Sequence, residues 1–516
     1  TGDTNYQATI RFPNWRARQP EPLIITVDTD LVGIKSHLPV PFTKNAEEPL
    51  GLSMNMSFPS NGTLRMDGSL ASQVNWTANF LKDDNRWDFD RGVIALGEYP
   101  RNAAIRGLHI HGQIEAFAAH KWFLEPWPLE ERMAVSERIR TIDVEIDNFY
   151  AWGQHFTNHR IQADRSGRDW LLRLSGQQLQ GRVTIPYDFD AGRLMTFDME
   201  RLHLPGDKTK TTESGTQLLN PEFLPSLSVR ADNFSLGEHQ FGRLEADIER
   251  SGRGLVTSLL TTEDKTFSLS GQAGWLVDAA NEFGQRTFVD AIITSTDTQQ
   301  TAQRLAYNPG IISDQMEIIM DVDWSGGPRS DFMGALNGEV TVQLGAGRLS
   351  EVDPGAGRMF GLMSITALPR RLALDFSDVF SEGFGYDQIK GDFRLVDGDA
   401  YTCNLTFTGP AADVGIVGRT GLVARDYDQA AIVSANVGGS LPVAGFLFGG
   451  PQVAAALLIF SQVFQKPLKD MGEIFYAVTG PWESPGIDLS DSQRFAEVST
   501  RAGCLSQEQI AFRNSE

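Results

Sequence analysis

Cysteine and positive charge are both scarce in this sequence. Cys403 and Cys504 are the only cysteines in 516 residues, too few for a disulfide scaffold or a zinc site built from several thiolates. Lysine and arginine number 45 against 66 aspartates and glutamates, a net charge of −21. So acidic a chain is poorly suited to nucleic acid, whose phosphates need neutralising, or to anionic lipid headgroups as its main attachment. The sparse cysteine fits the periplasm or the cytoplasm and does not choose between them.

Recognisable catalytic and metal-binding patterns are also lacking. His109 and His111 share one strand face and could hold a metal with a third ligand, but no second cluster lies nearby in the sequence, so we expect them to face solvent. His155 and His159 lie four apart in an expected turn and receive the same interpretation. The glycine-rich stretch 355–358 lacks the Lys-Ser/Thr of a phosphate-binding loop. We therefore expect no metal and no cofactor.

Paired acids are the remaining candidates for chemistry. Asp88 with Asp90, and Asp143 with Glu145, alternate on strands and could in principle serve glycoside hydrolysis. In a chain with 66 acids such pairs are expected by chance, on exposed faces. Cys403 follows the phase of an apolar strand face, which favours core or lining over a nucleophile. The sequence predicts that the protein is not an enzyme.

What the sequence does contain is apolar residues at every second position. Side chains two apart on a strand share a face, so each such segment predicts a strand with one apolar and one polar side. Gly and Asn punctuate the segments, as hairpin connections require. The clearest runs are Leu52-Met54-Met56-Phe58, Leu108-Ile110 with Ile114-Ala116, Met316-Ile318-Met320-Val322, Val340-Val342-Leu344 and Tyr401-Cys403-Leu405-Phe407.

An internal repeat lies in the middle of the chain. Asp147-Asn148-Phe149 recurs as Asp232-Asn233-Phe234, a shift of 85 residues (232 − 147), and the same shift relates two Arg-Ser-Gly-Arg turns at 165–168 and 250–253. The pattern predicts one β unit used twice in an array in which each unit packs on its neighbours. A coincidence among common turn residues is the alternative.

Helical patterns are few. A short helix is expected over 129–139, and we place a boundary between units there; another is expected over 298–306, ending at Asn308-Pro309-Gly310. The chain starts Thr1-Gly2-Asp3 and enters alternation at once, so we expect it to be cut from something longer. The divisions predicted are a β-groove segment (1–124), two related β units (140–295), a C-terminal region (311–490) and a polar tail (491–516), which we expect to be loosely ordered.

The C-terminal region carries a family resemblance. Three blocks hold it: Pro354-Gly355-Ala356-Gly357-Arg358, Leu368-Pro369-Arg370-Arg371-Leu372, and Phe380 to Phe384 with Gly391-Asp392-Phe393. Together with Val478-Thr479-Gly480-Pro481-Trp482, this text resembles the AsmA-like, YhdP-type envelope proteins of Gram-negative bacteria. The resemblance is dense over roughly 320–490 and looser over 50–300.

The resemblance implies a fold and a role. It implies a long, twisted β-sheet curled into a trough, anchored in the inner membrane and reaching across the periplasm, with an apolar lumen that conducts phospholipids toward the outer membrane. The inner-membrane anchor of that family has no counterpart in this chain. No catalytic motif comes with it.

The fold predicted is therefore mainly β: an elongated, twisted sheet curled into an apolar groove, with short C-terminal helices. From alternation alone a two-sheet sandwich would be favoured, because the same apolar face could pack on a second sheet. The repeat and the resemblance together favour the open groove. The residues expected to line it are Leu52, Met54, Met56, Ile110, Ile318, Met320, Val342, Leu374, Leu405 and Phe407.

An uncharged apolar run extends from Gln429 to Gln465. A helix over 451–464 would be about 21 Å long, short of the roughly 30 Å hydrocarbon core of a bilayer. Gly449-Gly450-Pro451 argues against one straight spanning helix over the whole run. Helices within 441–464 are expected either to plug or flank the end of the groove or to dip into a leaflet and deliver lipid. Their expected contact residues are Phe446, Phe448, Leu457, Leu458, Phe460 and Phe464.

The function predicted is bridge-like phospholipid transport between the inner and outer membranes, by a periplasmic part of an inner-membrane-anchored protein. The partners expected are phospholipids and the two membranes, not nucleic acid. One alternative is an envelope scaffold or assembly factor that carries no lipid. Another is a sugar-binding β-solenoid, which would need rows of exposed aromatic residues; the tryptophans at 87, 122, 127, 152 and 170 do not keep one spacing.

Overall fold

A computed structural model of the chain provides the structure. It describes most of the chain in eighteen stretches separated by gaps. The described residues are 2–13, 21–37, 43–59, 62–71, 73–84, 86–100, 105–119, 137–151, 154–186, 193–205, 220–281, 283–306, 310–328, 332–349, 384–410, 412–435, 473–482 and 484–504.

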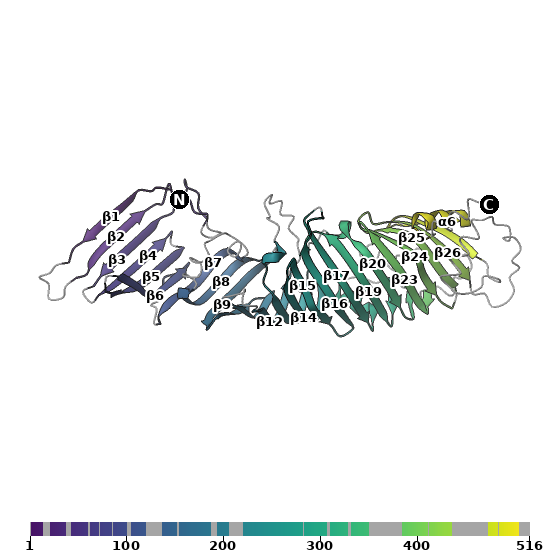
Figure 1. Cartoon of the computed structure of the whole chain (residues 1–516), viewed down its shortest axis with the longest axis horizontal. Helices are drawn as coiled ribbons and strands as arrows, with labels where there is room; N and C mark the ends of the chain where they lie inside the picture. The colour runs from purple at the N-terminus through teal and green to yellow at the C-terminus, as the bar shows by residue number, and fades with distance from the viewer. Residues whose placement is uncertain are drawn as a thin grey trace. The chain divides into compact units, whose positions relative to one another are not determined.

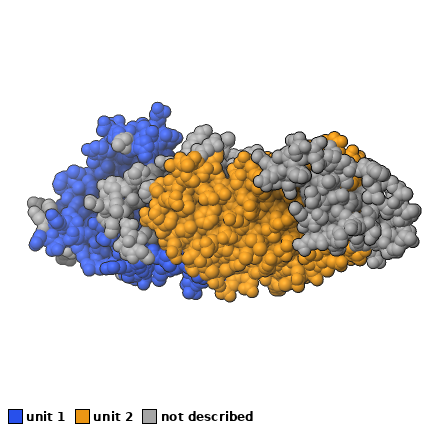
Figure 2. Space-filling model, turned by 45° about the vertical axis from the view of Figure 1, so that its right-hand side comes forward, with its two compact units in different colours: residues 1–212, 227–233 blue, residues 213–226, 234–516 orange. Residues whose placement is uncertain are grey.

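The chain divides into two compact units (Figure 2). The first comprises residues 1–212 and 227–233, and the second comprises 213–226 and 234–516. Strands dominate both units, which confirms the prediction of a mainly β protein.

Unit 1 is a ladder of strands that mostly pair with their neighbours in sequence (Figure 1). Pairing is antiparallel from β1 to β6 and again from β8 to β12, whereas β7 pairs in parallel with both β6 and β8. The strands are β1 (Tyr6–Arg11), β2 (Leu23–Thr29), β3 (Leu52–Phe58), β4 (Thr63–Leu70), β5 (Val74–Asp83), β6 (Arg86–Leu96), β7 (Gly107–Ala118), β8 (Ile139–Ala151), β9 (Gln154–Ser166), β10 (Asp169–Ser175), β11 (Leu179–Pro186) and β12 (Met195–Leu204).

Unit 2 continues with antiparallel pairs from β14 onward. β13 (Leu227–Leu236) contributes its first residues to unit 1 and its last to unit 2. The other main strands are β14 (His239–Ser251), β15 (Gly254–Glu263), β16 (Phe267–Val277), β17 (Gln285–Ser295), β19 (Met316–Ser325), β20 (Asn337–Leu344), β23 (Gln388–Val396), β24 (Asp399–Thr408), β25 (Ala412–Gly421), β26 (Asp426–Ala435), β27 (Glu473–Pro481) and β28 (Gly486–Ser490).

Twenty-five strands belong to one hydrogen-bonded sheet. Within the described residues, β1 pairs with β2 and β28 pairs with β27, and the sheet is open rather than closed on itself. A second, three-stranded sheet is formed by β18 (Ile311–Ser313), β21 (Gly347–Leu349) and β22 (Phe384–Tyr386). The Tyr386 hydroxyl on β22 donates a hydrogen bond to the Ile312 carbonyl on β18 and so links the outer strands of this small sheet. Burial raises the pKa of this hydroxyl.

The strand boundaries follow the 85-residue repeat. β9 shifted by 85 residues gives the bounds of β14, and the start of β10 gives the start of β15. The side-chain contacts repeat as well. Asn148 and Asn233 each donate to a backbone carbonyl of an earlier strand, that of Glu115 and that of Glu200, which are themselves 85 apart. The ring of Phe149 contacts Phe156, and the ring of Phe234 contacts Phe241, at the same shift.

Two α-helices are described. α3 (Thr298–Arg304) begins at the N-cap Asp297, whose carboxylate accepts from the Gln300 N–H, and it confirms the helix expected over 298–306. α6 (Ser492–Arg501) is capped in the same way by Asp491 and buries Phe495 and Val498. The expectation of loose order is therefore wrong for this part of the tail. Two short 3₁₀ turns, η1 (Pro221–Phe223) and η2 (Phe332–Ala335), complete the elements.

Candidate functional site: the apolar face of the sheet

Directly paired residues on neighbouring strands project from the same face of a sheet. In unit 1 the pairings therefore define rows that run across the strands from β1 to β12. One row contains an apolar residue or glycine on every strand: Ala8, Val27, Met54, Gly68, Trp76, Ile94, Ile110, Ile142, Ala163, Leu172, Val183 and Phe197. This row defines the apolar face of unit 1.

The opposite face of unit 1 is polar. Moving each position by one residue gives a second row, in which Ala95 alone is apolar: Gln7, Asp28, Ser53, Ser69, Asn75, Ala95, His111, Asp143, Gln162, Arg173, Arg182 and Asp198. Arg160 forms an ion pair with Asp143 on this face, and the guanidinium lowers the pKa of that carboxyl. Along these two rows the faces therefore differ in chemistry from β1 to β12.

A glycine keeps the apolar face continuous at β4. A Cβ added at Gly68 would lie 2.1 Å from Cζ2 of Trp76, so the indole ring lies across β4 where a side chain would otherwise stand. Trp76 thereby covers backbone on the neighbouring strand with aromatic surface. The row is apolar at Gly68 because of its neighbour's ring.

Unit 2 repeats this arrangement. A row of paired residues, each apolar or glycine, crosses from β14 to β23: Ala246, Leu260, Gly271, Ala291, Met320, Val340 and Phe393. It defines the apolar face of unit 2, which a neighbouring row extends through Leu344, Ile389, Phe407, Val414 and Val433. The opposite face carries Gln272, Asp290, Asp321, Glu339, Arg394, Tyr401, Arg419 and Asp428.

The apolar faces of the two units differ in burial. In unit 1 the side chains of Met54, Trp76, Ile94 and Ile110 are half-buried. In unit 2 the row is buried at Ala246 and Ala291 and half-buried at Met320 on β19, and Leu405 and Phe407 on β24 are each 1% exposed. The apolar row of unit 1 thus keeps accessible surface from β2 to β8 and is buried at Ala163 on β9 and at Val183 on β11.

The residues predicted to line a groove take these positions. Leu52, Met54, Met56 and Ile110 lie on the apolar face of unit 1 and are half-buried. Ile318, Met320, Val342, Leu405 and Phe407 lie on the apolar face of unit 2, the last three buried. Their contact with a ligand stays a prediction.

The other predicted contact residues fall in parts of the chain outside the described residues. These are Leu374 and the helix positions Phe446, Phe448, Leu457, Leu458, Phe460 and Phe464. Most of the helix expected over 129–139 also lies outside the described residues. Among the helices that the structure describes, none has both the length and the apolar character needed to cross a bilayer.

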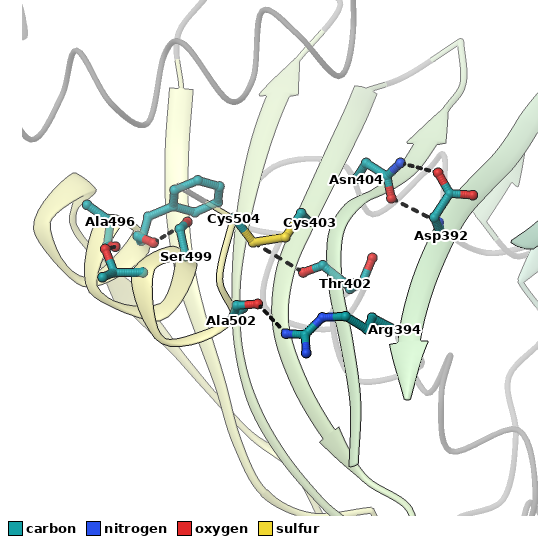
Figure 3. The surroundings of a disulfide bond; sticks show 11 residues. Asp392, Arg394, Thr402, Cys403, Asn404, Ala496, Ser499, Ala502 and Cys504 are labelled. Carbon is teal, nitrogen blue, oxygen red and sulfur yellow. Dashed lines mark hydrogen bonds between the residues drawn. A yellow bond between two sulfur atoms is a disulfide. The ribbon is translucent and has the colours of Figure 1, made fainter. Parts of the chain in front are cut away.

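Strict alternation fails at one position on β24. Tyr401 and Cys403 were expected to share a face with Leu405 and Phe407, but the register with both neighbouring strands shifts between Thr402 and Leu405. The side chain of Asn404 bonds both the backbone N–H and the carboxylate of Asp392, which fixes this bulge (Figure 3). A bulge inserts a residue and reverses the phase, so Thr402 is buried and Cys403 turns to the other face.

Cys403 forms a disulfide with Cys504, which sequence reasoning missed (Figure 3). The bond connects β24 to the end of α6, which packs on β25, β26 and β27 over Val417, Ala430 and Ile432. Arg394 donates to the Ala502 carbonyl at the C-terminus of this helix. Arg494 and Arg501 both form ion pairs with Asp428 on β26. Helix α6 thus covers the face opposite the apolar one.

The histidines and the acidic pairs are held by structural contacts. His109 bonds Thr141 and His111 bonds Glu98. His159 lies on β9, not in a turn, and is 2% exposed, so the expectation that it faces solvent is wrong. Its Nε2 accepts from the Leu179 N–H, and burial lowers the pKa of the ring.

Asp90 is also buried, contrary to expectation. It accepts hydrogen bonds from Arg91 and Arg106, which lower the pKa of its carboxyl. No group of three or more His, Cys, Asp or Glu side chains within the described ranges is arranged to hold a metal ion.

Comparison with known proteins identifies a family and a relative that cover most of the chain. The family model described as "YhdP protein" matches residues 1–487. The Intermembrane phospholipid transporter YhdP of Escherichia coli (strain K12) is 22% identical over 472 residues, which cover 90% of this chain and 37% of that protein. The chain therefore spans little more than a third of the length of this relative. No solved structure matches. The relative's name describes a transporter, with which the prediction of a non-enzymatic protein agrees.

Proposed function

The chain belongs to the YhdP family, and on this premise we propose that it carries phospholipids between the inner and outer membranes, with their acyl chains on the apolar face of its sheet. The observation that supports this role is the unbroken apolar row of unit 1, whose members remain half-buried from β2 to β8. A face that only packed against protein would not need to keep this surface accessible.

The energetic requirement for such a face is large. Two acyl chains contain about thirty methylenes, and exposing each to water costs roughly 0.8 kcal/mol, so unaided transfer through water costs on the order of 25 kcal/mol. A row of apolar side chains that passes from strand to strand replaces water along the path. Because such contacts are non-directional, no single side chain is required for binding.

The location follows from the same proposal. We infer a periplasmic portion of an inner-membrane-anchored protein, in which the sheet curves into a groove around the acyl chains. The segment 441–464 would then plug or flank the end of the groove, or enter a leaflet.

The proposal is tested by extracting the purified chain with organic solvent and identifying phospholipid by mass spectrometry. We expect phospholipid in the wild type. In Met320→Asp a carboxylate stands on the apolar face, and its desolvation should reduce the phospholipid recovered by at least about tenfold.

The adjacent residue provides a matched control. Ile319 lies on the same strand, is 40% exposed and projects from the opposite face, so Ile319→Asp should retain wild-type amounts of lipid. Circular dichroism establishes that both variants keep their strand content. An absence of phospholipid from the folded wild type, or equal loss in both variants, contradicts the proposal and favours a scaffold without lipid cargo.

A further inference from the structure

Arginine side chains gather at the margin of the apolar face of unit 1, where β7 and β8 begin beside β6. Arg106 directly precedes β7, Arg138 directly precedes β8, and Arg140 is the second residue of β8. The pairing of Leu108 with Ile139 brings the two strand starts side by side, and β6 pairs with β7 on the other side. We refer to Arg106, Arg138 and Arg140 as the arginine cluster.

Arg138 joins the arginine cluster to the apolar face. Its guanidinium lies over the ring of Phe89 on β6, with Cζ 5.8 Å from the ring centroid. Phe89 pairs with Phe80, which alternates with Trp76 on β5 and therefore projects from the apolar face. Both phenylalanines are half-buried, so apolar surface next to the cluster remains accessible.

The other two arginines lie over β6 and β7. The Arg106 Nε donates to Asp90 on β6 at 2.6 Å, and the Arg106 side chain is 76% exposed whereas that of Asp90 is 6% exposed. Asp90 also accepts a hydrogen bond from Arg91, so two arginines share one carboxylate. The Cγ of Arg140 lies 2.3 Å from the place where a Cβ on Gly107 would stand. Glycine at this position therefore lets the Arg140 side chain cross the start of β7.

The charge of the arginine cluster is not balanced by the protein. Among the described residues, the side chains of Arg138 and Arg140 are exposed and take part in no hydrogen bond and no ion pair. The stretches 86–91, 106–108 and 137–141 together contain five arginines and three acids, in a chain whose net charge is −21. Because like charges held close together repel one another, an anion bound among them is stabilising. The cluster is therefore suited to a negatively charged ligand.

The position of the arginine cluster restricts which anion it takes. A guanidinium can bond two oxygens of a phosphate at once. The accessible ring of Phe89 lies under the Arg138 guanidinium, so a ligand that fills both regions needs an anionic group joined to an apolar part. A phospholipid has this composition, because only glycerol separates its phosphate from its acyl chains. A free phosphate ion would leave the apolar surface uncovered.

We propose that the arginine cluster binds the headgroup phosphate of a phospholipid whose acyl chains lie on the apolar face of unit 1. This inference rests on the proposed function, which places the acyl chains on that face. It adds a preference among phospholipids. Phosphatidylglycerol, with its net negative headgroup, is retained over phosphatidylcholine, whose choline carries a compensating positive charge. The acidic remainder of the chain does not attract such headgroups, so the preference belongs to the cluster.

The test compares phosphatidylglycerol and phosphatidylcholine with identical acyl chains. The full chain is incubated with vesicles that contain the two lipids in equal amounts and is then separated from them, and the retained lipids are measured by mass spectrometry. We expect the wild type to retain about two- to tenfold more phosphatidylglycerol, as a few exposed charge contacts allow. The double variant Arg138→Gln, Arg140→Gln should bring the ratio to one or below without reducing total lipid, because the apolar face is unchanged.

A second pair of arginines provides the matched control. Arg173 and Arg182 pair with each other across β10 and β11 and belong to the polar row of the opposite face. Arg173→Gln, Arg182→Gln removes the same charge and should keep the wild-type ratio. An equal fall in both double variants would show an effect of net charge alone and overturn the inference. Arg138→Lys, Arg140→Lys retains both charges and should keep a preference for phosphatidylglycerol.

Further outcomes separate the lipid headgroup from free phosphate and the inference from the proposed function. Inorganic phosphate should displace no more phosphatidylglycerol than sodium chloride does at equal ionic strength. Stronger displacement by phosphate indicates a site for the free ion and overturns the inference. Equal retention of both lipids by the wild type also overturns it and leaves the proposed function standing. Retention of neither lipid contradicts the proposed function itself. The wild-type ratio decides if a variant fails to fold.

Discussion

Single residues decide where the apolar face is continuous and where it is interrupted. Gly68 lets the Trp76 ring lie across β4, whereas Asn404 reverses the phase of β24. His159 packs its imidazole against the ring of Phe156 and accepts a hydrogen bond from the Leu179 N–H. Composition and alternation do not reveal these roles, because each depends on a partner from another strand.

Gly68→Ala tests the role of the glycine. The new Cβ would stand 2.1 Å from the Trp76 ring, so the indole must move, and overpacking of this kind costs about 1–3 kcal/mol of stability. Thermal unfolding measures the loss, and tryptophan fluorescence reports the displaced ring.

Gly51→Ala is the matched control for that substitution. A Cβ at Gly51 meets no atom within 4 Å, so its unfolding temperature should stay close to that of the wild type. A Gly68→Ala protein as stable as Gly51→Ala would show that the indole does not need the space.

At the scale of elements, the strands were largely predictable and their ends were not. The alternating residues of β3, β7, β19 and β20 lie in strands with one apolar face, because a period of two is a strong local signal. The bulge at Asn404 escaped prediction since its cause is a bond to Asp392 on another strand. Helix α6 was not predicted, because its few apolar residues pack on strands that are distant in the sequence.

The disulfide fixes α6 to the sheet. It joins residues 101 apart, and cross-links that close long loops typically contribute about 2–4 kcal/mol. We expect the double variant Cys403→Ser, Cys504→Ser to unfold at a lower temperature than the wild type under oxidising conditions.

Reductant provides the control for this prediction. It should lower the unfolding temperature of the wild type and leave that of the double variant unchanged. The ion pairs of Arg494 and Arg501 with Asp428 remain in the variant, so circular dichroism should show most of its structure retained. A wild type that is indifferent to reductant would contradict a stabilising role for the bond.

On the scale of the whole molecule, each strand contacts mainly the strands beside it. The sheet contains 25 strands, and the chain divides into two compact units, each with its own internal contacts. In arrays of this kind, stability is the sum of local terms rather than the property of one core. The repeat at 85 residues made an array of neighbouring β units predictable from the sequence. Which residues share the apolar face was not predictable in the same way, because it depends on the register between strands.

We expect unfolding to occur in more than one transition. Gly68→Ala alters unit 1, so it should shift one transition, and reduction of the Cys403–Cys504 bond should shift another that belongs to unit 2. Differential scanning calorimetry resolves the two. A single transition that moves as a whole under either change would instead indicate one cooperative structure.

The parallel pairing of β7 with both β6 and β8 has a consequence for how unit 1 is assembled. Antiparallel hairpins on either side can form through short local turns. A strand that pairs in parallel with both neighbours needs long connecting segments, so its contacts form more slowly. We therefore expect β7 to be a seam, where two independently nucleated ladders meet late in folding.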